Sequence, residues 1–472
     1  MDPRTHLLLH GPIAPTLIRL AIPSTLIIVA QLIAGLAETW WVSRLGTEAL
    51  AAMALVFPVL MLCQMMSSGA MGGGISSAVA RALGAGDVQQ ARVLFFHAMA
   101  IAVVMGAIFT LAVVGGGSWL YAMLGAGEEA IVILANRYSD WLFAGAILIW
   151  VFNALASVIR GCGNMWVPAR IILWGTALLL LLSPPLIVGW GPWPGVGMLG
   201  GAWALLLYYA LGSLALLLHL LSPASLLRPR WADAVFQRAM FLRILGVGLA
   251  AMLSAACTNL AIATATSLMG RLGPEVVAGY GTAARLEYIM VALVFGLGSP
   301  LVAMVGTCIG AGERSRALRV TWIGAAMAVA LTESVGLLAT AFPQVWMLAF
   351  NQDAAVIEAG SLYLHWVGPW YGFFGLGLVL YFASQGAGRL AWPLAAGALR
   401  LALAVGLGWL LLHLTGDLAY VFLALGLALG VPASLAVVRH NFPLRAPFAS
   451  LLLLPLIVPG VVLGTAMYVF EV

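Results

Sequence analysis

The sequence predicts an all-α membrane protein made of two homologous six-helix lobes, with a further helix at the C-terminus. Of its 472 residues, 63% are hydrophobic and only 8% are charged, whereas roughly a quarter of the residues of a soluble protein are charged. Long apolar runs follow one another, and each reaches the ~20 residues that a helix needs to cross the hydrocarbon core. These runs lack the alternation of a barrel strand, so helices are the expected spanning elements.

Three short motifs occur twice, in the same order and at nearly one spacing. The pairs are SRLGTEALAA at 43–52 with GRLGPEVVAG at 270–279, ARALGAG at 80–86 with GTCIGAG at 306–312, and RGCGNMWVP at 160–168 with QGAGRLAWP at 385–393. Their offsets of 227, 226 and 225 residues indicate two homologous halves. Repeated halves in a membrane protein are typical of an alternating-access transporter with its site between them.

The apolar runs define the elements in order. Six spans are expected at about 17–42, 49–74, 93–117, 129–158, 166–190 and 198–221, and six more at about 241–269, 276–305, 318–341, 355–384, 391–414 and 418–438. They form an N-terminal lobe over 12–221 and a C-terminal lobe over 241–438. The polar stretch 222–240 is the expected cytoplasmic linker between the lobes. The uncharged run 448–470 predicts a thirteenth helix, and the alternative is a tail lying along the membrane interface.

Basic residues predict the orientation. All 21 are arginine, and seventeen of them, Arg400 among them, fall on the side of the N-terminus. Two lie on the other side and two, Arg137 and Arg285, lie inside spans. This asymmetry predicts a cytoplasmic N-terminus, and six spans per lobe give a parallel repeat about an axis along the membrane normal. The arginines are scattered singly, so they do not form a nucleic-acid-binding patch.

The cysteines predict neither a metal site nor a disulfide framework. Cys63, Cys162, Cys257 and Cys308 lie in or beside apolar segments at no metal-ligand spacing. They are expected to be buried thiols, and no cofactor is expected. The first apolar run is long enough to span the membrane and lacks a small-residue cleavage site, so no cleavable signal peptide is expected.

The motifs together resemble those of the multidrug and toxic compound extrusion (MATE) family. The resemblance covers residues 12 to about 440 and rests on IP at 22–23, ETWWVSRLGTEALAA at 38–52, SSAVARALGAGDVQQA at 76–91, RGCGNMWVP at 160–168 and the second-half copies. GYGTAARLE at 279–287 is closer to the DinF-like branch than to the NorM-like branch. The resemblance implies two six-helix lobes around a central cavity in a bacterial inner membrane. It also implies a monomer that exports amphipathic, often cationic compounds against an inward flow of protons or sodium ions.

The acidic residues Glu38, Asp140, Glu287 and Glu333 fall inside the predicted spans. Placing a charge at the centre of a membrane costs about 2.5–3.5 kcal/mol on insertion scales, so such residues are functional candidates. Glu38 lies where the family has an aspartate that binds the coupling ion, and the alternative is a solvated residue near the outer mouth. Glu287 is expected near the midplane with a partner on another helix, either as a second proton site or in a structural ion pair. Glu333 has no motif around it and is expected to be structural.

Asp140 has a more ambiguous setting. Arg137, three residues earlier, can pair with it on one helix face, so the pair is either a neutralised structural couple or part of the coupling site. At the repeat spacing Asp140 corresponds to His365, and Trp141 corresponds to Trp366. His365 can titrate near neutral pH or simply hydrogen-bond a cavity wall.

Departures from the family pattern favour proton coupling over sodium coupling. Ser183 stands where many members have an aspartate, and Thr258 and Phe374 stand where the NorM-like branch has acids. A sodium ion usually needs several oxygen ligands, whereas a proton needs one carboxylate with a tunable pKa.

A cavity between the lobes would be lined by the first, second and fourth helices and their counterparts. The expected lining residues are Gln31, Gln64, Met65, Trp141, Asn153, Asn259, Arg285, Met290, His365, Trp366 and Tyr371. Aromatic and methionine side chains suit flat hydrophobic cations. For each residue taken alone, a core or interface position is the more frequent role.

The predicted function is therefore proton-coupled antiport of amphipathic, cationic drugs or toxic metabolites by alternating access, with Glu38, Glu287 and Asp140 as coupling residues. Two alternatives within transporters are a sodium-coupled exporter and a lipid-linked sugar flippase of the same superfamily. An enzyme is not expected, because no span carries a His-Glu-x-x-His, paired-Asp or Gly-x-Ser-x-Gly arrangement.

Overall fold

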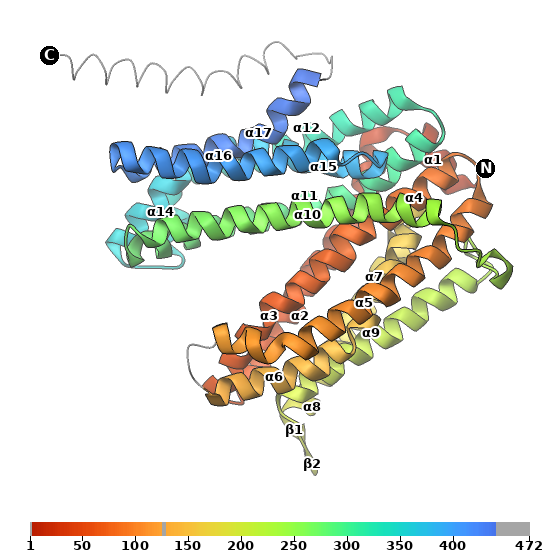
Figure 1. Cartoon of the computed structure of the whole chain (residues 1–472), viewed down its shortest axis with the longest axis horizontal. Helices are drawn as coiled ribbons and strands as arrows, with labels where there is room; N and C mark the ends of the chain where they lie inside the picture. Colours follow the sequence, from red (N-terminus) through yellow and green to blue (C-terminus); the bar gives the residue numbers. More distant parts are fainter. Residues whose placement is uncertain (1, 125–128, 440–472) are drawn as a thin grey trace. The chain divides into compact units, whose positions relative to one another are not determined.

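The computed structural model describes residues 2–124 and 129–439 and shows a chain that is helical almost throughout (Figure 1). Within these ranges the only strands are β1 (Gly189–Trp190) and β2 (Trp193–Pro194), which form a short antiparallel hairpin with Trp190 opposite Trp193. The prediction of an all-α protein is confirmed. The predicted thirteenth helix at 448–470 lies outside the described residues.

The first half of the chain follows the predicted order of spans. Its elements are α1 (Pro3–His10), α2 (Ile13–Ser43), α3 (Thr47–Gln64), the π-helical turn η1 (Met65–Met71), α4 (Gly72–Gly84), α5 (Val88–Leu124), α6 (Glu129–Ala144), α7 (Ala146–Gly161), α8 (Trp166–Ile187) and α9 (Met198–Leu221). The helices α3, η1 and α4 form one segment, while α6 and α7 are bent by 46° at Gly145.

The second half repeats this order after a short 3-10 turn, η2 (Trp231–Asp233), in the linker. Its elements are α10 (Arg238–Gly270), α11 (Pro274–Gly310), α12 (Arg314–Ala341), α13 (Pro343–Leu348), α14 (Ala354–Val367), the 3-10 turn η3 (Gly368–Trp370), α15 (Tyr371–Ala387), α16 (Ala391–Thr415) and α17 (Leu418–Arg439). Within the described residues, ten helical segments are long and apolar enough to cross a membrane, and the bent pair of α6 and α7 makes an eleventh. With the shorter apolar helix α17, each of the twelve predicted spans has a helical counterpart.

The repeated glycine motifs form matching helix ends. After α4, the N–H of Gly86 donates to the carbonyl of Leu83 and the N–H of Asp87 to that of Ala82. The same pair of bonds follows α11, at Gly312 and Glu313. This Schellman arrangement requires a left-handed residue, and φ is 77° at Gly86 and 79° at Gly312. The other repeated positions agree, with φ of 111° and 127° at Gly46 and Gly273, and 76° and 74° at Gly163 and Gly388.

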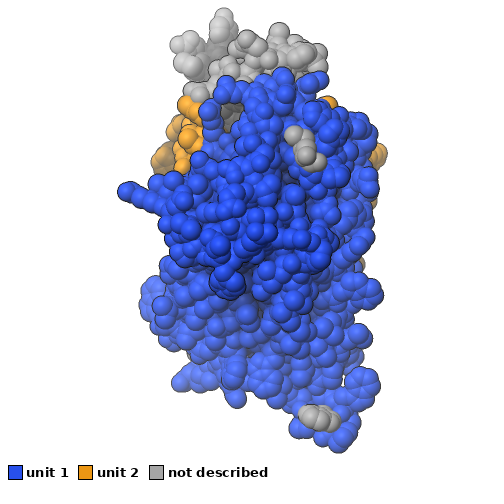
Figure 2. Space-filling view, turned by 90° about the vertical axis from the view of Figure 1, so that its right-hand side faces the viewer, with its two compact units in different colours: residues 1–252, 295–320, 382–390 blue, residues 253–294, 321–381, 391–472 orange. Residues whose placement is uncertain are grey.

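The described chain forms two compact units, which Figure 2 shows in separate colours. Unit 1 contains residues 1–252, 295–320 and 382–390, and unit 2 contains 253–294, 321–381 and 391–472. Three stretches of the second half of the sequence, 238–252, 295–320 and 382–390, therefore belong to unit 1. The division into lobes at 12–221 and 241–438 stays a prediction.

The linker is anchored on α5 within unit 1. The Nε2 of Gln89 donates to Asp233 at 2.7 Å, and the Nε of Arg92 donates to the carbonyl of Leu227 at 2.6 Å. The fully buried His97 accepts the N–H of Gln237 at 2.8 Å through its Nε2. The segment 222–240 is thus a structured connection rather than a free tether.

The π-helical turn of unit 1 is held by a side chain from the second half of the sequence. The Nε2 of Gln385, which is 1% exposed, lies 3.3 Å from the carbonyl oxygen of Gly69 and 3.4 Å from that of Ala70. A π-helix shifts carbonyls out of the usual α-helical pairing and is frequent at functional sites. Gln385 supplies these displaced carbonyls with a donor and so stabilises the turn.

Candidate functional site

Glu38 lies on α2 in unit 1, and its side chain is 9% exposed. Its Oε1 is buried and has no hydrogen-bond partner among the described residues. A methyl group at Gly201 of α9 would lie 3.0 Å from this oxygen, so the missing side chain of Gly201 makes room for the carboxyl group. Tyr138 and Tyr209 are close enough to interact with Glu38 electrostatically. The structure therefore buries this acidic group beside Gly201, with Tyr138 and Tyr209 within electrostatic range, and no ion pair joins Glu38 to a cation in the described part of the chain.

A polar cluster lies next to the π-helical turn of the same unit. The Nδ2 of Asn153 donates to Gln64 Oε1 at 3.1 Å and to Ser67 Oγ at 2.8 Å. Gln64 in turn donates to the hydroxyl of Tyr209, which also interacts electrostatically with Glu38. Gln64 and Asn153, two residues predicted to line a cavity, are thus joined in one network. Tyr209 connects this network to the surroundings of Glu38.

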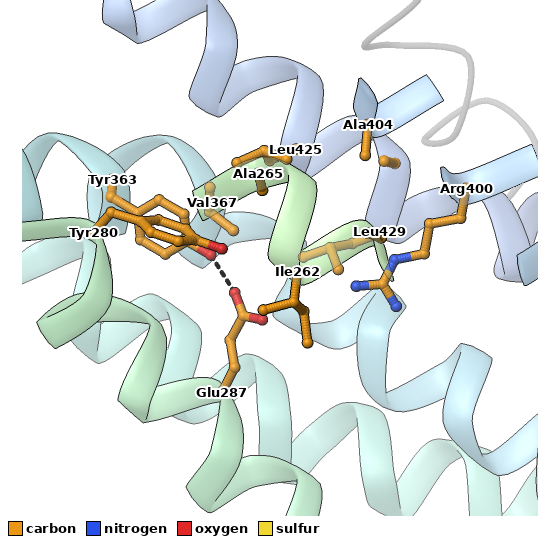
Figure 3. A pocket seen from close by; sticks show the side chains of 12 residues that line it. Ile262, Ala265, Tyr280, Glu287, Tyr363, Val367, Arg400, Ala404, Leu425 and Leu429 are labelled. Atoms are coloured by element: carbon orange, nitrogen blue, oxygen red, sulfur yellow. Dashed lines mark hydrogen bonds between the residues drawn. The ribbon is translucent and has the colours of Figure 1, made fainter. Parts of the chain in front are cut away.

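Glu287 lies on α11 in unit 2 and lines a small pocket (Figure 3). The hydroxyl of Tyr363, from α14, donates to Glu287 Oε1. Tyr280 packs edge to face against Tyr363 with ring centroids 5.2 Å apart. The cavity volume is about 30 Å³, which is room for about two water molecules. In this conformation the pocket suits water and a proton rather than a drug-sized ligand.

Arg400 completes this pocket, although its sequence position predicted a place among the cytoplasmic arginines. It was expected on the cytoplasmic side, but it is the tenth residue of α16, roughly 15 Å into that helix. Its guanidinium group points into the pocket from the wall opposite Glu287 (Figure 3). It also lies 5.9 Å from the ring centroid of Phe374. Its position ten residues inside the apolar run 391–414 was the available signal, and the positive-inside count obscured it.

Asp140 is not part of a comparable site. Asp140 and Arg137 are both exposed on α6, and no ion pair joins them in the described part of the chain. The expected i, i+3 pair is therefore wrong for this structure. Trp141 is 49% exposed and packs edge to face on Trp203 at 5.7 Å. His365, the expected counterpart of Asp140, is also exposed, on α14.

The remaining residues expected to line the cavity are dispersed within the two units. Gln31 and Met65 are exposed in unit 1. In unit 2, Asn259 is exposed and donates to the carbonyl of Ala255 on its own helix, while Arg285 is exposed and lies 5.9 Å from the ring centroid of Phe350. Trp366 is half-buried and Tyr371 and Met290 are fully buried, also in unit 2. A shared cavity lined by all of these residues stays a prediction.

Glu333 has a different role from the other intramembrane acids. Its Oε2 accepts the backbone N–H of Gly372 at 2.6 Å. Gly372 is the second residue of α15, whose first N–H groups have no partner within the helix. An acid at this place stabilises the start of a helix, in line with the structural role expected for Glu333.

The described residues contain no candidate metal-binding site. Over residues 2–124 and 129–439, no group of three or more His, Cys, Asp or Glu side chains could hold a metal ion. Cys63, Cys162 and Cys308 are buried thiols and Cys257 is partly buried, as the sequence predicts.

Many apolar helices, an internal repeat and isolated buried acids define a multi-pass membrane transporter. The sequence matches the MatE family over residues 23–184 and 250–410, and the chain belongs to this family. It is 29% identical over 382 residues to a protein of Shewanella oneidensis named FAD transporter, covering 80% of this chain and 83% of that protein. It is 22% identical to the probable multidrug resistance protein NorM of Thermotoga maritima, covering 80% and 81%.

Solved structures agree with this assignment. A crystal structure of MATE in the bent conformation superposes with a TM-score of 0.84 and 25% identity, over 92% of this chain and 95% of that one. A MOP superfamily transporter from Pyrococcus furiosus superposes with a TM-score of 0.82 at 24% identity, over 92% and 96%. The chain is therefore a transporter of small molecules and not an enzyme, and the resemblance seen in the motifs is confirmed.

Proposed function

We propose that this protein is a proton-coupled antiporter that exports amphipathic small molecules, cations included, out of the cytoplasm. The observation that carries the proposal is Glu38, a buried carboxyl group on a membrane-spanning helix whose Oε1 has no hydrogen-bond partner. A buried charge without a partner is costly. Binding a proton removes that cost, whereas releasing the proton requires access to water. A carboxyl group in this setting is suited to exchange protons as the site opens to one side or the other.

The surroundings of Glu38 favour a proton over a sodium ion. Sodium, like other hard cations, is held by several oxygen ligands. A Cβ at Gly201 of α9 would lie 3.0 Å from Glu38 Oε1, and glycine offers no side-chain oxygen to a cation there. One carboxyl group with a tunable pKa is sufficient for a proton.

Glu287 is the second proposed proton site. It is the half-buried acid of unit 2 that lines a water-sized cavity, and the hydroxyl of Tyr363 donates to its Oε1. We rank Asp140 below these two acids because it is exposed. The arginine distribution favours a cytoplasmic N-terminus for the proposed antiporter.

A gradient experiment in proteoliposomes tests the proposal. Proteoliposomes that contain the purified protein are loaded with a fluorescent organic cation. Efflux of this cation is then driven by an inward proton gradient or by an inward sodium gradient of the same size. Proton coupling predicts efflux only with the proton gradient. Efflux driven by sodium alone would establish the sodium-coupled alternative and refute the proton assignment.

A second candidate cargo is an anionic aromatic dinucleotide. The relative from Shewanella oneidensis is named FAD transporter, and Arg400 faces the unit 2 pocket without forming an ion pair in the described part of the chain. An intramembrane cation of this kind is able to attract a phosphate group. Efflux of FAD and of the organic cation, measured side by side, separates the two candidates.

A further inference from the structure

Two opposite charges share the small pocket of unit 2 without touching. Tyr363 occupies Oε1 of Glu287, and the second carboxyl oxygen points across the cavity toward Arg400 (Figure 3). Glu287 and Arg400 interact electrostatically, yet no ion pair within 4.0 Å joins them in the described ranges. The gap between them is a cavity of about 30 Å³, which water or a small movement of the guanidinium group can fill.

The other groups around Glu287 offer no competing charge. The titratable groups facing it are Tyr280 on its own helix α11, Tyr363 on α14 and Tyr371 at the start of α15. The residues that α10 and α17 contribute to the lining are apolar, namely Ala261, Ile262, Ala265, Leu425, Ala428 and Leu429. Arg285, two residues along α11, is exposed and lies over Phe350 instead. Among these described neighbours Arg400 is the one cation.

We propose that Arg400 is the counter-cation of Glu287. Its guanidinium group stabilises the carboxylate of Glu287 each time that residue gives up its proton. In the protonated state the proton neutralises Glu287 and Arg400 remains across the cavity. When the O–H bond breaks, the proton passes to cavity water and the guanidinium group compensates the new negative charge. Arg400 acts through Glu287 and is therefore a positioning residue. The inference rests on the proposed role of Glu287 as a proton site.

This arrangement has a functional consequence. A carboxylate left unpaired in an apolar pocket would recover its proton at once, because a buried charge without a partner is costly. A cation inside the pocket lowers that cost and allows Glu287 to stay deprotonated while the protein changes conformation. Among the described residues no cation faces Glu38 in this way, so the two acids would release protons under different conditions.

The test is a pH titration of the purified full-length protein by infrared spectroscopy. The C=O stretch of protonated Glu287 is identified as the band lost in Glu287→Gln. In Arg400→Gln we expect the midpoint of this band to rise by about one pH unit, since an opposite charge nearby typically shifts a carboxyl titration by one to three units. Arg400→Lys, which keeps the charge, is expected to restore most of the shift. Arg271→Gln, an exposed arginine after α10, is the matched control and leaves the midpoint unchanged.

An unchanged midpoint in a folded Arg400→Gln protein would overturn the proposal. Arg400→Met, which retains the apolar stem of the side chain, serves the same purpose if the glutamine variant does not fold. Failure of the proposed function has a separate signature, namely normal substrate-driven proton release in Glu287→Gln. If Arg400→Gln loses FAD binding while the midpoint of the Glu287 band stays unchanged, Arg400 binds the cargo instead, and the counter-cation role is refuted.

Discussion

Glu38 in unit 1 and Glu287 in unit 2 are both acids within membrane-spanning helices, but the protein accommodates them differently. Glu38 lies against a glycine with one oxygen unpartnered. Glu287 accepts a tyrosine hydroxyl and faces an arginine across a cavity. The absence of a side chain at the neighbouring glycine gives Glu38 its space. A hydrogen-bond donor and a cation stabilise Glu287 instead.

The comparison shows that the two halves share the backbone conformation of their turns but not the positions of their acidic residues. The paired glycines of the two halves have the same left-handed conformation, with φ of 77° and 79° at Gly86 and Gly312. The acids, in contrast, lie on non-equivalent helices, α2 in the first half and α11, the second helix of the second half. A turn needs a glycine in each half, whereas a proton site needs only one acid with its own surroundings.

The largest expected effect comes from neutralising either acid. Glu38→Gln and Glu287→Gln should each lower substrate-driven proton release in liposomes at least about ten-fold, because a carboxamide cannot exchange a proton. Release is measured with a pH-sensitive dye inside the vesicles.

Glu129→Gln, an exposed acid at the start of α6, is the control and should retain release. Normal release in Glu38→Gln would remove unit 1 from the coupling mechanism. Normal release in Glu287→Gln would remove unit 2.

The space around Glu38 can be tested by filling it. In Gly201→Ala the new methyl group would lie 3.0 Å from Glu38 Oε1, so the carboxyl group must move, and we expect a several-fold loss of transport. Combining it with Glu38→Asp, which is one methylene shorter, should recover part of that loss, because the two changes act on one contact. Transport rates of the two single variants and the double variant decide this. Strictly additive losses would show that Gly201 does not position Glu38.

The support of Glu287 can be tested by removing its donor. Tyr363→Phe deletes one hydrogen bond, worth about 1 kcal/mol, and we expect a roughly five-fold lower transport rate. Tyr280→Phe is the matched variant, because no hydrogen bond joins Tyr280 to Glu287 in the described residues, and its effect should be less than about two-fold. Equal effects of both variants would assign the tyrosines to packing alone.

The smallest effect is expected outside the membrane, at Asp233 in the linker. The hydrogen bond from Gln89, the backbone N–H of Arg230 and the nearby arginines hold the pKa of Asp233 below its usual value. Its stabilising contribution is therefore complete above the unfolded value of about 3.9 and is lost as the pH falls through the lowered value. Asp233→Asn should reduce the melting temperature at pH 7 by about 2 °C.

The same variant is a control for the two acids. The pH profile of transport between pH 5 and 8 should be unaltered in Asp233→Asn, because Asp233 is ionised throughout that range. A profile shifted as in a Glu287 variant would show that the linker takes part in coupling.

Much of the architecture was determined by the sequence alone. Apolar runs of membrane-spanning length predict all twelve spans, because the hydrophobic requirement of a bilayer is local and can be read residue by residue. The doubled glycine motifs likewise predict matched helix ends, because only glycine takes a left-handed φ without strain. Glu38 and Glu287 were identified for the same reason, as charges within apolar runs.

Only the tertiary structure decided which residues surround those acids. Gly201, Tyr363 and Arg400 are 163, 76 and 113 residues away from their acids in the chain, and no local pattern connects such distances. Arg400 was counted with the cytoplasmic arginines because a count of charges along the sequence does not show how far inside a helix a side chain lies or what it faces. The pair expected between Arg137 and Asp140 failed for a related reason, since spacing on a helix makes contact possible and the surroundings decide whether it forms. Length and hydropathy fix the helices, while packing between them fixes the electrostatics of each site.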